Sequence, residues 1–145
     1  MVVTQVVRQW GRVGGMESYV WNLSKCLADL DVEVQIICDT QHESNSFVSR
    51  YFCVDKINDR PRWRSMQQFR SNVCSLIADD RTSFGIIHSH ERLNCHDVTT
   101  WHGPPMTGRS HWLQAKLSSR VRAWCEMEVA ELNCKAVIPV SEYIN

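Results

Sequence analysis

Two histidine-containing segments carry the side chains of this 145-residue chain that are best suited to chemistry. His-Ser-His-Glu at 88–91 ends an apolar run, and Thr-Thr-Trp-His at 99–102 ends a second run before a Gly-Pro-Pro turn. Side chains two apart in a strand share a face, so the imidazoles of His88 and His90 could converge on one atom. An imidazole can bind a metal, move a proton or hydrogen-bond a substrate. Both segments are therefore candidate site residues.

A metal-dependent hydrolase is one interpretation of these histidines. His96 and His102 would then be further ligands beside His88 and His90. No fitting carboxylate is defined, and the other motifs of His-x-His metal hydrolases are missing. We therefore expect no metal and no cofactor. In the competing interpretation one histidine packs in the interior and another is solvated or contacts substrate.

A glycine pair forms a third candidate site. Gly14 and Gly15 follow an apolar run and precede a helical pattern. Glycine lets the backbone approach a ligand closely, and the amides of a helix N-terminus favour phosphate. With Gly11 the spacing does not fit the dinucleotide fingerprint, and no Gly-Lys-Ser/Thr follows as in a P-loop. The pair is either a phosphate-binding turn or a turn without a ligand.

The elements that must position these residues alternate between strand and helix. Hydrophobic periodicity predicts strands over 2–7, 32–38, 51–54, 84–90, 97–102 and 136–140. It predicts helices over 16–30, 66–77 and 109–132, with Ser141 as the cap of a further helix from Glu142. This order indicates an α/β fold, a Rossmann-like doubly wound, mostly parallel sheet with helices on both faces. Ligands bind at the carboxyl ends of such strands, where all three candidate segments lie.

Composition excludes several classes of protein. Hydrophobic residues make up 43% and charged residues 22%, as in a globular domain rather than a disordered chain. The 16 basic residues balance the 16 acidic ones, so no net positive field favours nucleic acid. No apolar run approaches the roughly 20 residues that span a bilayer, and the N-terminus does not fit a secretory signal. The seven cysteines include no Cys-x-x-Cys pair, so we expect reduced core residues in a reducing compartment.

Four segments, in this order, resemble glycosyltransferase family 4, whose members are retaining, nucleotide-sugar-dependent enzymes with the two-domain GT-B fold. The first is Gly-Gly-Met-Glu at 14–17 with the helix and strand after it. Ile-Ile-His-Ser-His-Glu at 86–91 resembles an Asp-h-h-His-x-His strand (h, hydrophobic), with Gly85 in place of Asp. Thr-Thr-Trp-His-Gly at 99–103 resembles a Thr-x-His-Gly segment, and Ile-Pro-Val-Ser-Glu at 138–142 resembles the family's h-x-Val-Ser segment.

The resemblance implies roles for particular residues. Gly14 and Gly15 would bind the donor diphosphate, and His102 would lie near the transferred sugar as the catalytic residue. Acceptor contacts would come from Glu17, His90, Glu91 and Ser141. No metal is implied, and the nucleotide sugar is a substrate rather than a cofactor.

The resemblance also implies a domain organisation. Residues 1–145 would be the N-terminal, acceptor-side domain, truncated at its C-terminal end, with the C-terminal donor domain absent. Such a chain would be inactive alone. The alternative is a non-catalytic module that binds a sugar or nucleotide, or that completes a cleft with a partner chain.

Expected partners are a nucleotide sugar and a glycan or lipid-linked acceptor, as in the synthesis of cell-envelope polysaccharide or glycolipid. The basic, tryptophan-containing stretch 109–124 could lie on the inner face of a membrane. Alternatively it is a packed helix whose Lys and Arg side chains reach solvent at its edge. We therefore expect a cytoplasmic protein, either free or peripheral to the membrane.

Overall fold

Six parallel strands form the central sheet, in the order β5-β3-β1-β6-β7-β8. The computed structural model describes residues 1–56, 61–102 and 118–140. The strands are β1 Val2–Val6, β3 Glu33–Cys38, β5 Arg50–Cys53, β6 Ile86–Ser89, β7 Val98–Trp101 and β8 Ala136–Pro139. Two short strands, β2 Gln9–Trp10 and β4 Thr40–Gln41, pair separately beside the sheet.

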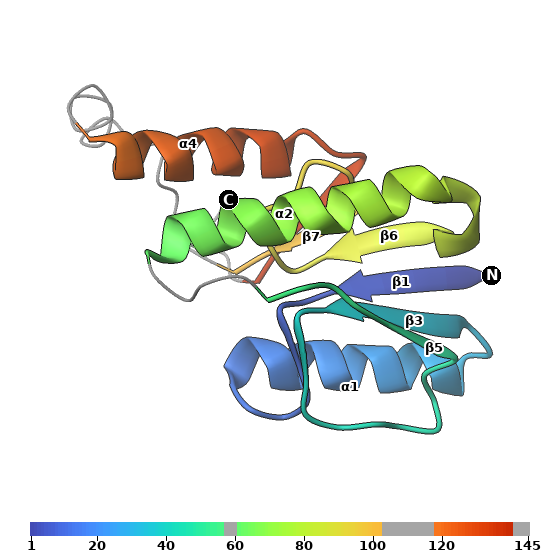
Figure 1. Ribbon diagram of the computed structural model, residues 1–145. Helices are drawn as coiled ribbons and strands as arrows, with labels where there is room; N and C mark the ends of the chain where they lie inside the picture. Colours follow the sequence, from blue (N-terminus) through green and yellow to red (C-terminus); the bar gives the residue numbers. More distant parts are fainter. Residues whose placement is uncertain (57–60, 103–117, 141–145) are drawn as a thin grey trace.

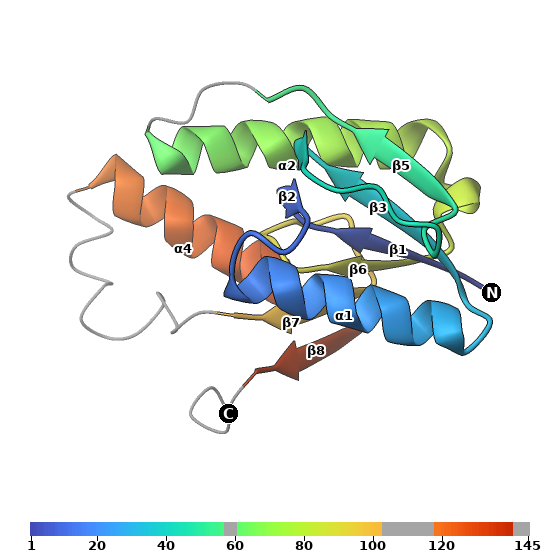
Figure 2. The ribbon, with the colours of Figure 1, turned by 90° about the horizontal axis from the view of Figure 1, so that it is seen from below.

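Helices cover both faces of the sheet (Figures 1 and 2). Helix α1 (Gly15–Asp29) lies on one face, while α2 (Arg62–Asp79) and α4 (Ser119–Leu132) lie on the other. A 3-10 turn, η1 (Arg81–Phe84), connects α2 to β6. None of the helices in the described ranges is long and apolar enough to cross a membrane.

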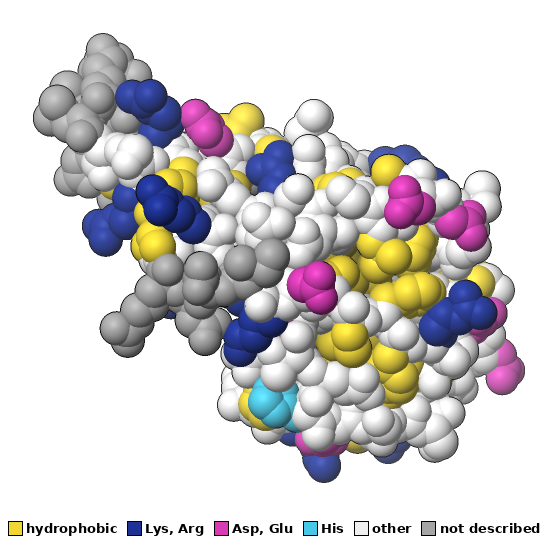
Figure 3. Space-filling model, viewed as in Figure 1, with side chains coloured by type: hydrophobic (Ala, Val, Ile, Leu, Met, Phe, Trp, Pro, Cys, Tyr) yellow, Lys and Arg dark blue, Asp and Glu magenta, His cyan; other side chains and the backbone are white. Residues whose placement is uncertain are grey.

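The core has two halves because successive side chains of a strand point to opposite faces. Val6 and Ile37 belong to the cluster on the α2 side, whereas Val7 and Ile36 belong to the cluster on the α1 side. All four are fully buried. Some apolar side chains of the α2 face remain visible at the surface (Figure 3); Phe52 is a partly buried member of that cluster.

The strand order creates a switch point between β1 and β6. From β1 the chain proceeds to β3 and β5 on one side, then returns to place β6, β7 and β8 on the other side. In an open α/β sheet the crevice for ligands lies outside the carboxyl ends of the strands at this point. A ligand site is therefore expected among the residues that follow β1 and β6.

The predicted fold class is confirmed, and every strand predicted over the described residues is present. The helix predicted from residue 109 is described only from Ser119, where Ser118 caps it by accepting a hydrogen bond from the Val121 amide. Ser141 and the helix predicted after it lie outside the described residues. The strands β2 and β4 were not predicted, because two residues carry no periodic signal.

The prediction of reduced core cysteines is wrong for the pair Cys74 and Cys95, which is oxidised, and for Cys26 and Cys53, which are exposed. Cys74 of α2 forms a disulfide with Cys95, which lies in the loop between β6 and β7. The remaining five cysteines form no disulfide bond. Among them Cys38 is buried beside Cys53 on the neighbouring strand, and burial together with that second thiol raises the pKa of Cys38 to about 12. The argument for a reducing compartment from reduced cysteines therefore does not hold for Cys74 and Cys95.

Candidate functional site

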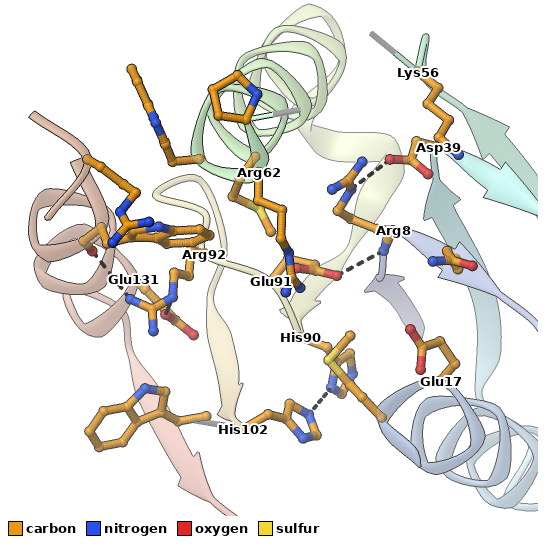
Figure 4. A pocket seen from close by; sticks show the side chains of 18 of the residues that line it. Arg8, Glu17, Asp39, Lys56, Arg62, His90, Glu91, Arg92, His102 and Glu131 are labelled. Carbon is orange, nitrogen blue, oxygen red and sulfur yellow. Dashed lines mark hydrogen bonds and ion pairs between the residues drawn. The ribbon is translucent and has the colours of Figure 1, made fainter. Parts of the chain in front are cut away.

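A cleft of about 1070 Å³ lies at the carboxyl edge of the sheet (Figure 4). Its walls come from the segments after β1, β3, β5, β6 and β7, from the first turns of α1 and α2, and from side chains along α4. The polar and charged side chains that line it are Arg8, Gln9, Glu17, Asp39, Lys56, Arg62, His90, Glu91, Arg92, His102, Arg120 and Glu131. The cleft thus occupies the crevice that the switch point predicts.

Arg8 ties together the ends of three strands. Its backbone amide donates to Oε1 of Glu91 at 3.2 Å, and its Nε donates to Oδ2 of Asp39 at 2.7 Å. A terminal guanidinium nitrogen also donates to the hydroxyl of Ser65 in α2 at 3.0 Å. The guanidinium is therefore held in a fixed geometry by charge-assisted and neutral hydrogen bonds. Sequence analysis did not identify Arg8, because its partners lie 31 to 83 residues away.

Glu91 is a buried carboxyl group with a raised pKa. Burial raises the pKa of Glu91 to about 7, although the amide and the charge of Arg8 oppose that rise. Glu17 and Asp39 add to it by repulsion. A carboxyl group that titrates near neutrality can either donate or accept a hydrogen bond, and such groups are common at functional sites.

Three histidines form a cluster beside Glu91. Nδ1 of His90 lies 3.3 Å from Nε2 of His102, and Nε2 of His90 lies 2.7 Å from the side-chain oxygen of Gln5. The ring of His88 lies 4.4 Å from that of His90, and its Nε2 lies 2.7 Å from the hydroxyl of Thr100. Since these nitrogens are bonded within the protein, the imidazoles do not converge on one atom as a metal site requires.

Burial keeps this cluster neutral. It lowers the pKa of His88 to about 4 and that of His90 well below the usual value, and repulsion from neighbouring histidines adds to both shifts. Burial also lowers the pKa of His102, although Glu17 opposes the change. The described residues contain no group of three or more His, Cys, Asp or Glu side chains that could hold a metal ion.

The glycine pair forms the start of α1. Gly14 is the N-cap residue, its carbonyl accepts the Ser18 amide at 2.9 Å, and no side chain caps the helix. A Cβ at Gly15 would meet no atom within 4 Å, whereas one at Gly14 would contact the carboxylate of Glu17. The first-turn amides of α1 are therefore available to an anion that approaches Gly15.

The cleft gathers four of the seven predicted site residues, namely Glu17, His90, Glu91 and His102. Gly14 and Gly15 adjoin it at the start of α1 without lining it, and Ser141 lies outside the described residues. The sequence suggested these four residues through the spacing of the histidine segments and the family resemblance, and the structure adds that they line one cleft at one edge of the sheet.

Comparison with known proteins supports a specific family. The sequence model of Glycosyltransferase Family 4 matches residues 13–145. The chain belongs to this family. No curated protein sequence gives a significant match.

Among solved structures, this family 4 chain resembles WaaG, described as a glycosyltransferase involved in lipopolysaccharide biosynthesis. The TM-score is 0.75 at 10% sequence identity, and the match covers 99% of this chain and 40% of that one. At such low identity the similarity is one of fold, that of the N-terminal half of a GT-B glycosyltransferase. The family 4 chain thus spans less than half the length of this structural relative.

Gly85 stands where the family pattern has Asp. Its φ is +57°, a conformation in which other residues are strained. An added Cβ would contact the backbone oxygen of Val2 in β1. The position therefore requires glycine in this family 4 chain, because the loop before β6 passes directly against β1.

An ion-pair cluster that the sequence did not reveal holds α4 beside the cleft. Arg92 lies 3.6 Å from Glu128 and 3.9 Å from Glu131, and its guanidinium stacks over the ring of Trp124 at 5.3 Å. Burial raises the pKa of Glu131, although Arg92 opposes the shift. Acidic residues late in this helix, which oppose its dipole, are thus explained by buried pairing with Arg92.

Trp124 bears on the predicted membrane contact. It is half-buried under Arg92 and lines the cleft, so in the described part of 109–124 the tryptophan packs inward. Arg120 and Arg122 are exposed around the buried Val121. This arrangement follows the packed-helix interpretation for residues 118–124.

Proposed function

We propose that this family 4 chain is the N-terminal, acceptor-side domain of a retaining glycosyltransferase. The reaction transfers a sugar from a nucleotide-sugar donor to a glycan or lipid-linked acceptor. The convergence of four polar side chains on the cleft at the switch point carries the proposal: Glu17, His90, Glu91 and His102. The family match adds the reaction class, and the structural relative's role in lipopolysaccharide biosynthesis favours a cell-envelope glycan as acceptor.

We assign the donor diphosphate to the amides at Gly14 and Gly15. These amides carry no side-chain cap, and the space at Gly15 is open. As the sugar–phosphate bond breaks, negative charge develops on the leaving nucleoside diphosphate. Backbone donors aimed at that charge stabilise it without reorganising. No separate covalent nucleophile is assigned.

His102 is the proposed catalytic residue, because it is neutral, only half-buried, and lines the cleft. It orients the transferred sugar through a hydrogen bond. Glu17 and Glu91 contact acceptor hydroxyls. His90 is nearly fully buried and both its ring nitrogens are bonded, so its role is to support His102 rather than to touch the acceptor.

Transfer requires more than these 145 residues in our proposal. The chain corresponds to 40% of its structural relative, and a GT-B cleft is formed between two domains. The nucleotide sugar would be held mainly by the second domain. The chain alone is therefore expected to release no nucleoside diphosphate.

A nucleoside-diphosphate release assay tests the proposal. The natural protein in which this domain occurs is incubated with uridine-, guanosine- and adenosine-diphosphate sugars, and the anomeric configuration of the product is read by NMR. We expect release with retained configuration from one donor. His102→Ala should lose at least tenfold in kcat with an unchanged melting temperature, whereas the exposed His42→Ala should keep its activity. Absence of transfer to every acceptor tried, or equal losses of activity and stability in His102→Ala, would contradict the proposal.

A further inference from the structure

A line of three side chains runs from the interior of the sheet to the cleft. Gln5 of β1 is 0% exposed, His90 after β6 is 4% exposed, and His102 after β7 is half-buried at the cleft surface. The contacts are 2.7 Å from Gln5 Oε1 to His90 Nε2 and 3.3 Å from His90 Nδ1 to His102 Nε2. Figure 4 shows the second contact at the base of the cleft.

The direction of both hydrogen bonds follows from the chemistry of Gln5, the first residue of the line. A carbonyl oxygen only accepts, so Nε2 of His90 must carry a proton and donate it to Gln5. Burial and the neighbouring histidines lower the pKa of His90, which keeps its ring neutral. A neutral imidazole has one N–H, so Nδ1 of His90 is an acceptor. Nε2 of His102 must therefore be the donor.

We propose that Gln5 and His90 are positioning residues that fix His102 as its Nε2–H tautomer, leaving Nδ1 as a neutral hydrogen-bond acceptor for a sugar hydroxyl in the cleft. The assignment of tautomer rests on the two contacts of His90 and on the neutrality of its buried ring. The choice of a sugar hydroxyl as ligand rests on the proposed function. An acceptor at this position selects a hydroxyl, which can donate, over a fluorine or an ether oxygen at the same place, which cannot.

The surroundings hold the line in place. The Tyr19 ring makes T-shaped contacts with His90 and His102, with centroid distances of 5.9 and 5.5 Å. The ring of His88 contacts that of His90 at a tilted angle and is hydrogen-bonded to Thr100. Neither neighbour bonds to the two nitrogens that join His90 to His102. The proton positions thus follow from Gln5 outward, because the Gln5 oxygen that faces His90 can only accept a hydrogen bond.

Nitrogen-15 NMR of histidine-labelled chain measures the tautomers directly. We expect His90 and His102 to show protonated Nε2 and unprotonated Nδ1 between pH 6.5 and 8. Gln5→Leu should move the ring shifts of both histidines toward values averaged between the tautomers, because it removes the acceptor. Tyr19→Phe, which keeps the ring contacts, should leave the shifts unchanged. If Gln5→Leu fails to fold, the spectrum of the unmodified chain still decides.

A protonated Nδ1 on His102 would overturn the proposal, because the line of donors would then run the opposite way. In the active natural protein, replacing donor-sugar hydroxyls one at a time by fluorine should lower kcat/KM about tenfold at a single position. This loss should disappear in Gln5→Leu. If His102 is the expected tautomer but no fluorine substitution lowers kcat/KM, the assignment of a sugar hydroxyl as its ligand is wrong. A wrong tautomer in an active transferase overturns this inference alone, while no transfer at all contradicts the proposed function and leaves the tautomer result standing.

Discussion

The backbone amide of Arg8 donates a 3.2 Å hydrogen bond to the carboxylate of Glu91 and so joins the carboxyl ends of β1 and β6. Through its guanidinium, Arg8 also reaches Asp39 at the end of β3. The floor of the cleft is therefore braced across three adjacent strands by one residue. Glu91 is the member of this group whose charge changes near neutral pH, since its pKa is raised to about 7.

This raised pKa predicts a pH-dependent stability. The unfolded carboxyl has the ordinary glutamate pKa of about 4.5, so between that value and about 7 the folded chain binds more protons than the unfolded chain. Stability is then lost as the pH rises through this window. Glu91→Gln stays neutral and still offers an oxygen to the Arg8 amide. From pH 4.5 to 8 it should gain on the order of 3 kcal/mol relative to wild type.

Urea unfolding of both proteins at several pH values measures this difference. Glu126→Gln, on the exposed side of α4, is the matched control and should follow the wild type at every pH. Parallel stability curves for Glu91→Gln and wild type would show that Glu91 is charged throughout, contrary to the assigned pKa.

Gly15→Val should separate donor use from folding. The substituted side chain meets open space, so the melting temperature should change little. It would stand where a diphosphate approaches the α1 amides, and transfer by the natural protein should fall at least tenfold. Unchanged turnover would exclude phosphate binding at this turn.

Gly85→Ala is the matched control for that experiment. At a φ of +57° and against the backbone of Val2, an added methyl group should cost about 1–3 kcal/mol. Activity per folded molecule should stay the same, because Gly85 does not line the cleft. The two glycines are therefore expected to show opposite patterns, one lost activity and the other lost stability.

Arg92→Met should destabilise the packing of α4. The substitution removes the cation that pairs with Glu128 and Glu131, whose side chains are 0% and 4% exposed. Breaking buried pairs in this way costs about 3–5 kcal/mol. Denaturant unfolding measures it, with the exposed Arg122→Met as control, which should stay within about 0.5 kcal/mol of wild type. Similar losses in the two variants would mean that the ion pairs do not hold α4.

The fold could be predicted from the sequence because strands and helices leave patterns in consecutive residues. Buried β-branched runs and helical stripes such as Met16 to Leu30 are read from consecutive residues. His102 and Glu91 were found for the same reason, since each follows a recognisable strand. Whether they meet depends on the strand order, which local patterns do not give and which the structure shows.

The supporting residues could not be found in this way. Gln5 reads as one polar position in a strand, and Arg92 as one more charge in a loop, until partners 85 and 39 residues away come beside them. Gly85 did give a local signal, because a lone glycine at the start of a strand suggests close backbone approach. An odd cysteine count, with no paired spacing, pointed away from the disulfide.

The disulfide is the last feature with a measurable consequence. Cys74 and Cys95 are 21 residues apart and join α2 to the loop that also carries Glu91 and Arg92. Closing a loop of this length stabilises a fold by about 3 kcal/mol in the chain-entropy account. Cys74→Ser with Cys95→Ser should lower the free energy of unfolding by that order, and a reductant should do the same to wild type. Cys26→Ser, at an exposed free thiol, is the control and should have no effect. If the double variant is as stable as wild type and reductant leaves the melting temperature unchanged, the two thiols are not joined in solution.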